Sequence, residues 1–336
     1  MAAGIRDVAE MAHVSAGTVS KYLNTPDRVA PATAERIREA IDTLAYVRND
    51  AARQLRMGRS RTVGLLAFDI ANPFFIDLAH GVEQQATKHG LSVLLGNSDE
   101  SEERESAYLD LFEEQRVHGI LVSPMGNIDK RIERFHRQGI PVVLLDKTGD
   151  PSLSSSVSID DVAGGYMAAA HLLSRQRTKL AFVGGPIGLR QVDDRLAGAR
   201  KAVEDHPGAT LEVIPVSNRD VVEGSHVGES LLLRPPRDRP DGIFAMNDRL
   251  AFGLLHTIVT EGRVRVPEEM AVIGYDDIEF AAAAIVPLSS IRQPREAFAT
   301  AAMNLLVSEE SSLETGEHSQ IVLQPQLVVR ASSQAR

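Results

Sequence analysis

Hydrophobic residues near the start of the chain recur at helical spacing in two short stretches. The first stripe consists of Val8, Ala9 and Ala12, and the second of Val14, Val19 and Leu23. Residues three or four apart lie on one face of a helix, so each stripe can bury against the other. At the break between them, His13 tolerates a positive φ and Ser15 can cap the helix that follows. The pattern predicts two short helices that meet at a tight corner.

The second of these helices presents small and polar side chains on the face opposite its apolar stripe. They are Ala16, Gly17, Thr18, Ser20, Lys21 and Asn24. A third short helix is expected to begin at Pro31, because apolar residues follow it at spacings of four and three. Those residues are Ile37, Ile41 and Leu44. Three such helices are typical of a helix-turn-helix domain, whose second helix enters the DNA major groove. For this stretch alone, a pair of ordinary surface helices is the alternative.

Residues 49–61 follow neither the pattern before them nor the one after them. Helix-forming residues run as far as Leu55, and Gly58 and a basic tail come next. A helix of this length is marginal in water by itself. The segment is therefore predicted to be a linker that becomes ordered only when something holds it.

From Thr62 the pattern changes to short apolar runs that alternate with longer amphipathic stretches. The runs are TVGLLAF, LSVLLGN, GILVSP, PVVLLD, KLAFVGG, TLEVIPVS, DGIFAMND and MAVIGYDD. Alternation of this kind is typical of βα units and parallel sheets. We expect about eight to ten strands, in one large sheet or two smaller ones. The Ser-rich residues 154–158 and the segment PLSSIRQP are the expected crossing points between two lobes.

Polar and aromatic side chains follow several of the predicted strands. They are Asp69, Asn72 to Phe75, Ser123, Asp146, Asp160, Asn247, Asp248, Tyr275 and Asp276. Ligands of parallel α/β sheets bind beyond the carboxyl ends of the strands, and such a set suits a hydroxyl-rich or heterocyclic small molecule. Asp and Asn are also common there as helix caps, and we expect about half of them to have that role. Phe74 and Phe75 are equally suited to the core.

The charge distribution favours a basic segment joined to an acidic body. The chain has 336 residues, of which 43% are hydrophobic, and is long enough for more than one domain. Its net charge of −10 by itself argues against nucleic acid. Residues 1–61, however, hold 10 Lys and Arg against 7 Asp and Glu, whereas the rest holds 26 against 39. This division is expected if only the first segment contacts phosphates.

Several classes of protein are disfavoured by what the sequence lacks. It has no Cys and no Trp, no signal-peptide pattern at its start and no apolar run that approaches a membrane span. The motifs GxGxxG, GxxxxGK[ST], GxSxG and HExxH do not occur. We therefore expect a cytoplasmic protein with no catalytic residues, no cofactor, no metal and no membrane partner. An enzyme of similar fold and an extracytoplasmic sugar-binding protein are the rival interpretations.

Taken together, these segments resemble the LacI/GalR (lactose-repressor/galactose-repressor) family of bacterial transcription regulators over nearly the whole chain. IRDVAEMAHVSAGTVSKYLN is similar to its helix-turn-helix signature and NDAARQLRMGRS to its hinge. NPFF, RLAGAR, AMND and VIGYDD resemble landmarks of its effector domain in the usual order. The resemblance implies an N-terminal all-α helix-turn-helix domain and an α/β effector domain of two parallel βα lobes, similar to periplasmic binding proteins. The implied boundaries are 1–48 for the DNA-binding domain, 49–61 for the hinge, about 62–160 and 292–320 for lobe 1, and about 161–291 and 321–336 for lobe 2.

The resemblance also assigns residues that contact DNA. Base-reading positions are matched by Ala16, Gly17 and Lys21, phosphate-contacting positions by Thr18, Ser20 and Asn24, and hinge positions by Asn49 and Leu55. Lys21 can donate to guanine, whereas Gly17 offers no side chain. Leu55 matches the hinge leucine that wedges into the minor groove. The implied partner is palindromic double-stranded operator DNA, bound by a homodimer whose hinge folds on DNA. A dimer of dimers stays open, although residues 321–330 are predicted to be strand and form no leucine-heptad tail.

In the effector domain, the resemblance points to one cleft and to a sugar-like effector. Arg195, Asn247 and Asp276 match effector-contacting positions, and Asp69, Phe74, Ser123 and Asp146 are expected to line the same cleft. Arginine and carboxylate groups are good partners for the hydroxyls of a sugar. The implied function is a repressor of a carbohydrate-utilisation operon. A purine-responsive or phosphosugar-responsive regulator of the same fold is the alternative.

Two positions depart from the family pattern. Residues 218–220 are Asn-Arg-Asp where several relatives have an aromatic ring, and Arg48 stands where proline is common. The first departure leaves the ligand class open. We expect Arg219 to be a solvated loop charge, as is common in loops. An Arg219 that points inward would instead indicate an acidic or phosphorylated effector.

Overall fold

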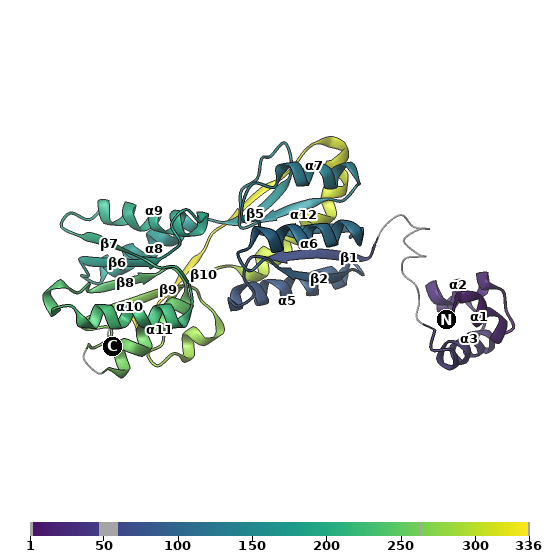
Figure 1. Cartoon of the computed structure of the whole chain (residues 1–336), viewed down its shortest axis with the longest axis horizontal. Coiled ribbons are helices and arrows are strands. Elements are labelled where there is room, and N and C mark those ends of the chain that lie inside the picture. Colours follow the sequence, from purple (N-terminus) through teal and green to yellow (C-terminus); the bar gives the residue numbers. More distant parts are fainter. Residues whose placement is uncertain (1–2, 47–59, 262–263, 335–336) are drawn as a thin grey trace. The chain divides into compact units, whose positions relative to one another are not determined.

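The computed structural model describes residues 3–46, 60–261 and 264–334, apart from the side chains of residues 310–315. The chain divides into two compact units, residues 1–60 and 61–336 (Figure 1). Of the helices that the structure describes, none is long and apolar enough to cross a membrane. Arg48 and the predicted hinge residues Asn49 and Leu55 lie outside the described residues.

The first unit contains three helices around a small core. They are α1 (Ile5–Met11), α2 (Ala16–Asn24) and α3 (Pro31–Thr43), with the 3-10 turn η1 (Pro26–Arg28) before the last. Val8, Val19 and Ile37 are fully buried between them. The predicted corner is confirmed, because His13 has a φ of 52° and the Ser15 hydroxyl accepts a hydrogen bond from the Thr18 amide at 3.1 Å.

Lobe 1 of the second unit is a six-stranded parallel sheet in the order β11-β5-β4-β3-β1-β2. Its strands are β1 (Thr62–Ala67), β2 (Ser92–Asn97), β3 (Gly119–Val122), β4 (Val142–Leu145), β5 (Ser155–Ile159) and β11 (Gln320–Leu323). One face packs on α5 (Pro73–Lys88) and α12 (Arg295–Thr315), and the other on α6 (Glu102–Glu114) and α7 (Asp129–Arg137). Leu65 and Leu66 of β1 enter the two separate cores, because successive side chains of a strand face opposite sides.

Lobe 2 is a second six-stranded sheet, in the order β12-β10-β9-β8-β6-β7. Its strands are β6 (Lys179–Gly184), β7 (Thr210–Pro215), β8 (Gly242–Ala245), β9 (Ala271–Asp276), β10 (Ser289–Arg292) and β12 (Gln326–Val328). The helices α8 (Asp161–Ser174) and α9 (Arg190–Glu204) pack together on one face, and α10 (Val221–Leu233) and α11 (Asp248–Thr260) on the other (Figure 1). The 3-10 segments η2 (Pro236–Asp238) and η3 (Glu279–Ala283) lie in its loops. The predicted fold class is confirmed, except that the edge strand β12 is antiparallel to β10.

The chain passes between the lobes three times, after β5, after β10 and between β11 and β12. The two expected crossing segments are therefore strands themselves, and the chain crosses where each of them ends. The boundary expected at residue 321 is wrong, because residues 321–323 belong to β11 and pair with β5 of lobe 1. The third crossing lies at residues 324–325.

All eight predicted runs form strands, and the strand predicted over residues 321–330 is present as two shorter ones, β11 and β12. The described residues contain two further strands, β5 and β10. The sequence pattern missed β5 because its buried side chains include Ser155, Ser156 and Ser158. Their hydroxyls find partners inside the lobe, as when Ser155 Oγ donates to Glu309 Oε2 at 2.6 Å. A strand that buries paired hydroxyls carries no hydrophobic signal.

Candidate functional site

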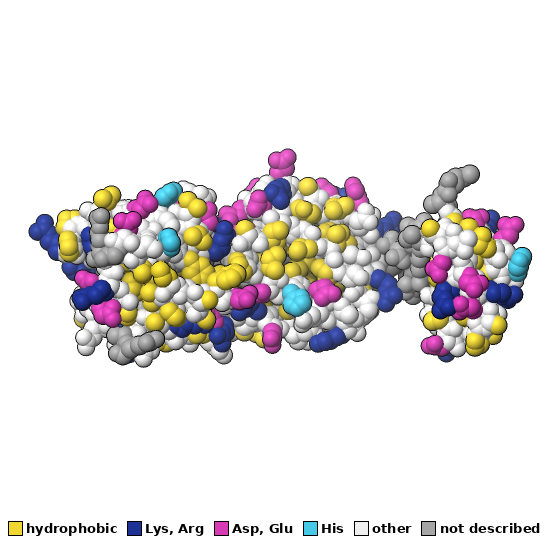
Figure 2. Space-filling view, turned by 90° about the horizontal axis from the view of Figure 1, so that it is seen from below, with side chains coloured by type: hydrophobic (Ala, Val, Ile, Leu, Met, Phe, Trp, Pro, Cys, Tyr) yellow, Lys and Arg dark blue, Asp and Glu magenta, His cyan; other side chains and the backbone are white. Residues whose placement is uncertain are grey.

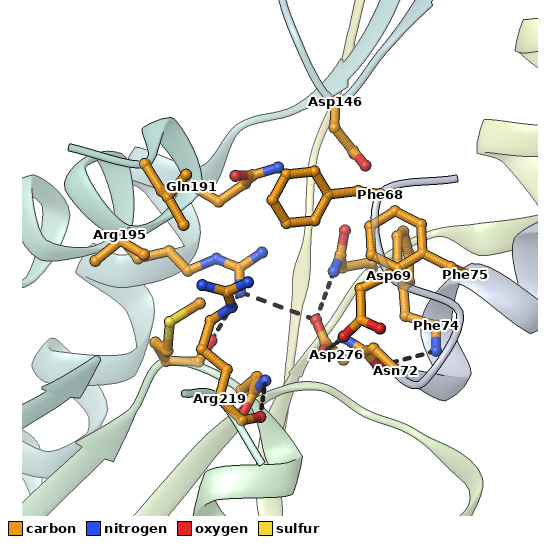
Figure 3. Close-up of a pocket in the computed structure, with 15 residues that line it drawn as sticks. Phe68, Asp69, Asn72, Phe74, Phe75, Asp146, Gln191, Arg195, Arg219 and Asp276 are labelled. Carbon is orange, nitrogen blue, oxygen red and sulfur yellow. Dashed lines mark hydrogen bonds and ion pairs between the residues drawn. The ribbon is translucent and has the colours of Figure 1, made fainter. Parts of the chain in front are cut away.

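A pocket lies between the two lobes, at the carboxyl ends of strands from both sheets (Figure 3). It is lined by Phe68, Asp69, Asn72, Phe74, Phe75 and Asp146 of lobe 1, by Leu189, Gln191, Val192, Arg195, Arg219, Met246, Asn247 and Asp276 of lobe 2, and by Gln293 of the second crossing. Six of the seven residues predicted to contact an effector thus come together in one place. The seventh, Ser123, is not among the lining residues.

Arg195 reaches the pocket from α9 and is almost wholly enclosed. Its Nε donates to Asp161 Oδ1 at 2.9 Å, and its Nη1 donates to the Met246 carbonyl at 2.7 Å and lies 3.9 Å from Asp276 Oδ1. The guanidinium carbon lies 3.6 Å from the centroid of the Tyr275 ring. Burial acts to lower the pKa of Arg195, but Asp161, Tyr275 and Asp276 together raise it. The residue is therefore a fixed cation with a rigid fork of donors.

Glycines in the contact between α8 and α9 fix where Arg195 sits. A Cβ atom added to Gly165 would lie 2.0 Å from the Arg195 carbonyl oxygen, and one added to Gly198 would lie 2.0 Å from the Val162 carbonyl oxygen. Both distances are far inside van der Waals contact, so the two helix backbones can touch only where a side chain is missing. The landmark RLAGAR thus contributes Gly198 to helix packing as well as Arg195 to the pocket.

Asp276 is the buried acceptor at the centre of the pocket. It ends β9 with a left-handed φ of 105° and is 2% exposed. Asn72 Nδ2 donates to its Oδ2 at 2.9 Å, and Gln293 Nε2 donates to its Oδ1 at 2.7 Å. Burial raises the pKa of Asp276, while Arg195 and the two amide donors act to lower it. The carboxylate is held in one orientation by groups from both lobes.

Asn72 and Asn247 are helix caps and pocket residues at the same time. The Asn72 side chain accepts from the Phe74 amide at 3.1 Å at the start of α5, and its amide nitrogen faces Asp276. The Asn247 side chain accepts from the Leu250 amide at 2.9 Å at the start of α11 and donates to the Arg219 carbonyl at 3.0 Å. A residue of this kind can therefore cap a helix and face the pocket at the same time.

Asp146 follows β4 with a left-handed φ of 54° and is 8% exposed. Burial, reinforced by the charge of Asp161, raises the pKa of Asp146 to about 7, against the effect of Arg190 and Arg195. Ser123 Oγ donates to Asp146 Oδ2 at 3.4 Å. The prediction that Ser123 lines the cleft is therefore replaced by a supporting position behind Asp146.

Three other residues at or just after the ends of strands have structural roles. Asp160 caps α8 by accepting from the Ala163 amide at 2.9 Å, and Tyr275 forms the floor under the Arg195 guanidinium. Asp248 is fully buried, and accepts from Ser290 Oγ at 2.6 Å and from the Ile278 amide at 2.9 Å. Burial raises the pKa of Asp248 well above its ordinary value.

Charged side chains join the two lobes across the pocket. Asp69 of lobe 1 accepts from Arg249 of α11 at 3.2 Å. The guanidinium of Arg190, at the start of α9, donates to the Asp146 carbonyl. These contacts and the hydrogen bond from Asn72 to Asp276 hold the lobes together around the pocket. All three contacts cross from one lobe to the other.

Arg219 points into the pocket, and the expectation that it is a solvated loop charge is wrong. Its side chain is 10% exposed, Nη1 donates to the Gly185 carbonyl at 3.0 Å, and Nη2 forms an ion pair with Glu100. Figure 3 shows it entering from lobe 2 on the same side as Arg195. The reason lies in contacts distant in the sequence, since Asn247 holds the Arg219 carbonyl and Glu100 of lobe 1 pairs with the guanidinium.

Three aromatic rings stand on the lobe 1 side of the pocket. Phe74 and Phe75 meet edge to face with centroids 5.1 Å apart, and Phe68 lies 6.3 Å from Phe75. All three rings also belong to the lobe 1 core, so the same side chains pack in the core and line the pocket. The Arg219 guanidinium carbon lies 5.7 Å from the Phe68 ring centroid, within cation–π range.

Several lining residues were missed by the sequence analysis. Phe68 belongs to a predicted strand run, and only its place at the carboxyl end distinguishes it from core. Gln191 and Val192 lie in the first turn of α9, upstream of the landmark RLAGAR. Gln293 follows β10, a strand that was itself not predicted. Their shared signal is position at a strand end or helix start.

The predicted DNA-contacting surface on α2 is only partly free. Gly17, Lys21 and Asn24 are exposed, whereas Ala16 is half-buried and packs on the helical core, which corrects the expectation that it points outward. The Thr18 hydroxyl lies 2.9 Å from the Ser15 hydroxyl. Asn24 Nδ2 donates to the carbonyl of half-buried Ser20 at 2.8 Å. Lys21 carries the charge of this surface.

Comparison with known protein families matches both units. Residues 4–49 match the family described as bacterial regulatory proteins, lacI family. Residues 169–333 match the periplasmic binding protein-like domain. The helical unit and most of the two-lobed unit thus have separate counterparts among known families.

Individual relatives cover nearly the whole chain. The HTH-type transcriptional repressor PurR of Photobacterium profundum is 32% identical over 98% of this chain and 98% of its own. A solved structure of the transcriptional regulator CelR in complex with cellobiose is 29% identical, with a TM-score of 0.70 over 98% of this chain and 99% of that chain. A LacI family transcriptional regulator from Enterococcus faecium with bound ribose is 29% identical, with a TM-score of 0.72 over 81% of this chain and 98% of that chain.

Proposed function

The chain belongs to the LacI family of bacterial regulatory proteins, and from this premise we propose that it represses a carbohydrate-utilisation operon under the control of a sugar-like effector. Relatives that match over the whole length are transcriptional repressors, so the chain is a DNA-binding transcriptional regulator and not an enzyme. The effector is proposed to bind between the lobes, where it changes how firmly they are held together. That change alters the affinity of the helical unit for operator DNA.

The observation that carries the effector part of the proposal is the chemistry of the pocket. Arg195 and Asp276 offer a rigid donor fork and a fixed acceptor, and aromatic rings stand opposite. Hydroxyl groups need donors and acceptors at fixed positions, and the apolar face of a sugar ring stacks on aromatic rings. The solved structures with cellobiose and with ribose support a sugar as the ligand class.

A purine effector is the second candidate. The name PurR of the Photobacterium profundum relative suggests it, and the rings of Phe68 and Phe75 suit a flat heterocycle. Thermal unfolding of the purified protein against a panel of sugars and purines separates the two candidates. A ligand at a hundredfold its Kd raises the free energy of unfolding by about 2.7 kcal/mol. We expect a sugar to give that shift in the wild type and not in Asp276→Asn, and a shift from purines alone would replace the sugar by a purine.

For DNA binding we propose that two copies of α2 read a palindromic operator. Lys21 is the base-reading side chain, Gly17 and Ala16 allow close approach, and Thr18, Ser20 and Asn24 face phosphates. Asn49 and Leu55 belong to the proposed hinge, in which Leu55 wedges into the minor groove. This assignment rests on the resemblance to the family signature and on the exposure of Lys21.

The DNA part is tested by selection of binding sites from random duplexes with the full chain. Lys21→Ala is expected to lose base preference at one position of each half-site, at a cost of about 1–3 kcal/mol. The control is Arg36→Ala, which removes one exposed cation from α3 of the same unit. It is expected to weaken all sequences alike. Equal losses on operator and random DNA in Lys21→Ala would show that Lys21 contacts only phosphate.

The proposed dimer surface is an apolar face that spans both lobes. Figure 2 shows hydrophobic side chains gathered on the side where α5 and α10 lie. Exposed apolar residues there are Ile70, Ile76 and Leu95 of lobe 1 and Val221, Val222, Phe280 and Ile285 of lobe 2. Sedimentation is expected to show a dimer for the wild type and a monomer for Val222→Asp with Phe280→Asp. A dimer that survives both changes would place the interface elsewhere.

A further inference from the structure

Arg219 is a buried cation that no carboxylate of its own lobe neutralises, among the residues that the structure describes. Within lobe 2 its guanidinium donates to the Gly185 carbonyl. The adjacent carboxylate of Asp220 is engaged at the start of α10, where it accepts from the Glu223 amide at 2.8 Å. Burial lowers the pKa of Arg219, Arg249 adds to this, and Asp69 of lobe 1 opposes it. A buried charge that loses its partner is strongly unfavourable, so an anion that hydrogen-bonds to Arg219 lowers that cost.

The anion that reaches Arg219 comes from lobe 1. Glu100 lies in the loop after β2 with a left-handed φ of 58°, and its side chain is 36% exposed against 10% for Arg219. Glu100 therefore keeps much of its contact with water and is the more easily displaced partner. When the lobes separate, Glu100 leaves with lobe 1, and Arg219 keeps its lobe 2 contact with the Gly185 carbonyl but has no carboxylate partner there.

We propose that the effector carries an anionic group, the carboxylate of a sugar acid or the phosphate of a sugar phosphate, which binds Arg219 in place of Glu100. The proposal rests on the proposed function, since it names the class of ligand for that same pocket. Nη1 of Arg219 is anchored on the Gly185 carbonyl, so Nη2 is the position that an anion takes. In this arrangement the sugar hydroxyls face Asp276 and Arg195, and the anionic group binds at the Arg219 side of the pocket.

The other charges of the pocket are compatible with an anionic ligand. Asp69 is paired with Arg249 at 3.2 Å, Asp161 with Arg195 at 2.9 Å, and Asp276 accepts two amide hydrogen bonds. These carboxylates are paired or hydrogen-bonded. Asp146 also lines the pocket, and because burial raises its pKa to about 7, it carries less negative charge near neutral pH than an ordinary carboxylate. Arg219 is the lining cation whose carboxylate partner stands on the opposite lobe and is partly exposed.

Calorimetric titration of the full chain with matched compounds tests the proposal. The probes are D-glucose, D-gluconate and D-glucose 6-phosphate, and D-ribose, D-ribonate and D-ribose 5-phosphate. We expect one anionic member of a set to bind at least about tenfold more tightly than its neutral parent, which is the contribution of one charge-assisted hydrogen bond. Arg219→Gln is expected to remove that preference. Arg295→Gln is the control, because Arg295 also donates across the lobes, to the Asp277 carbonyl at 3.1 Å, but does not line the pocket.

Glu100→Gln separates ligand exchange from a simple latch. If the anion replaces Glu100, removing that competitor strengthens anion binding, by up to about fivefold for a partly exposed ion pair. If the pair with Arg219 only holds the lobes closed, the same change weakens binding of every ligand. Weaker binding of the anionic probe in Glu100→Gln overturns the proposal.

The remaining outcomes distinguish this proposal from the proposed function. Binding of a neutral sugar that is equal in the wild type and Arg219→Gln, and lost in Asp276→Asn, overturns the anionic effector and leaves the sugar-controlled regulator standing. Binding of none of the six compounds also overturns the proposal as stated. The proposed function is still tested separately, by selection of operator sites from random duplexes and by thermal unfolding against the panel of sugars and purines.

Discussion

The carboxyl group of Asp146 destabilises the two-lobed unit when it is ionised, and we expect Asp146→Asn to abolish this pH-dependent destabilisation. The neutral amide has nearly the same shape, and asparagine tolerates the left-handed φ of 54° at this position. It can also still accept the hydrogen bond from Ser123. The change therefore removes the charge of one pocket residue and little else.

The size of the effect follows from the pKa of Asp146 in the folded state. Burial and the nearby Asp161 raise it from 3.8 to about 7, and Arg190 and Arg195 only partly oppose this. A carboxyl with a raised pKa favours folding while protonated, so its cost begins as pH rises through about 4 and is complete above about 7. A rise of about three pKa units at 1.36 kcal/mol each corresponds to about 4 kcal/mol. Asp146→Asn should thus match the wild type near pH 4 and exceed it by about 4 kcal/mol at pH 8.

Urea unfolding at pH 5, 6, 7 and 8, followed by circular dichroism, measures this difference. Other buried carboxyl groups, such as Asp276 and Asp248, titrate in both proteins and cancel in the comparison. The expected result is a gap in the free energy of unfolding that widens up to about pH 7 and then stays constant. A gap independent of pH, or a variant less stable than the wild type at pH 8, would refute the burial argument for Asp146.

Three further predictions concern packing, capping and the hinge. Gly165→Ala should force α8 away from α9 and lower the free energy of unfolding by about 1–3 kcal/mol. Because Arg195 lies in the same helix contact, effector binding should also weaken, as measured by thermal unfolding with and without ligand. Unchanged values would show that the helices can separate freely. Ser15→Ala should destabilise the helical unit by about 1 kcal/mol, because the Thr18 amide loses the side-chain acceptor that caps the helix. Thermal unfolding of the isolated residues 1–60 measures this, and Ser15→Asn should restore the stability of the wild type. Leu55→Ala should weaken operator binding and leave effector affinity unchanged, as gel-shift and calorimetric titrations would measure; full operator affinity would contradict the hinge assignment.

Much of the fold could be predicted because its signals are local and repeated. The corner at His13 and Ser15 follows from residue types that tolerate positive φ and cap helices, and the structure has both features. Eight apolar runs between amphipathic stretches became eight strands. What was missed lacks a local signal. The strand β5 buries serine hydroxyls whose partners, such as Glu309, lie more than 150 positions away in the chain.

The pocket could be predicted in part for the same reason. Asn247 and Asp276 are brought together because the carboxyl ends of parallel strands meet at one edge, a rule that needs no distant contacts. Arg195 reaches the same pocket from α9, and it was predicted only from the resemblance of RLAGAR to a family landmark. The direction of Arg219 depends instead on Asn247, which holds its carbonyl, and on Glu100 from the other lobe. Neither contact can be inferred from the composition of a loop.

We propose that a ligand between the lobes controls DNA affinity, and the decisive measurement is operator binding with and without that ligand. Fluorescence anisotropy of the selected operator is measured for the wild type and Asp276→Asn, in the absence and presence of the compound that gives the largest thermal shift. We expect the ligand to change the operator Kd by about tenfold or more in the wild type and not at all in Asp276→Asn, whose operator affinity without ligand stays the same. An operator Kd that saturating ligand leaves unchanged in the wild type, or changes equally in both proteins, would contradict it.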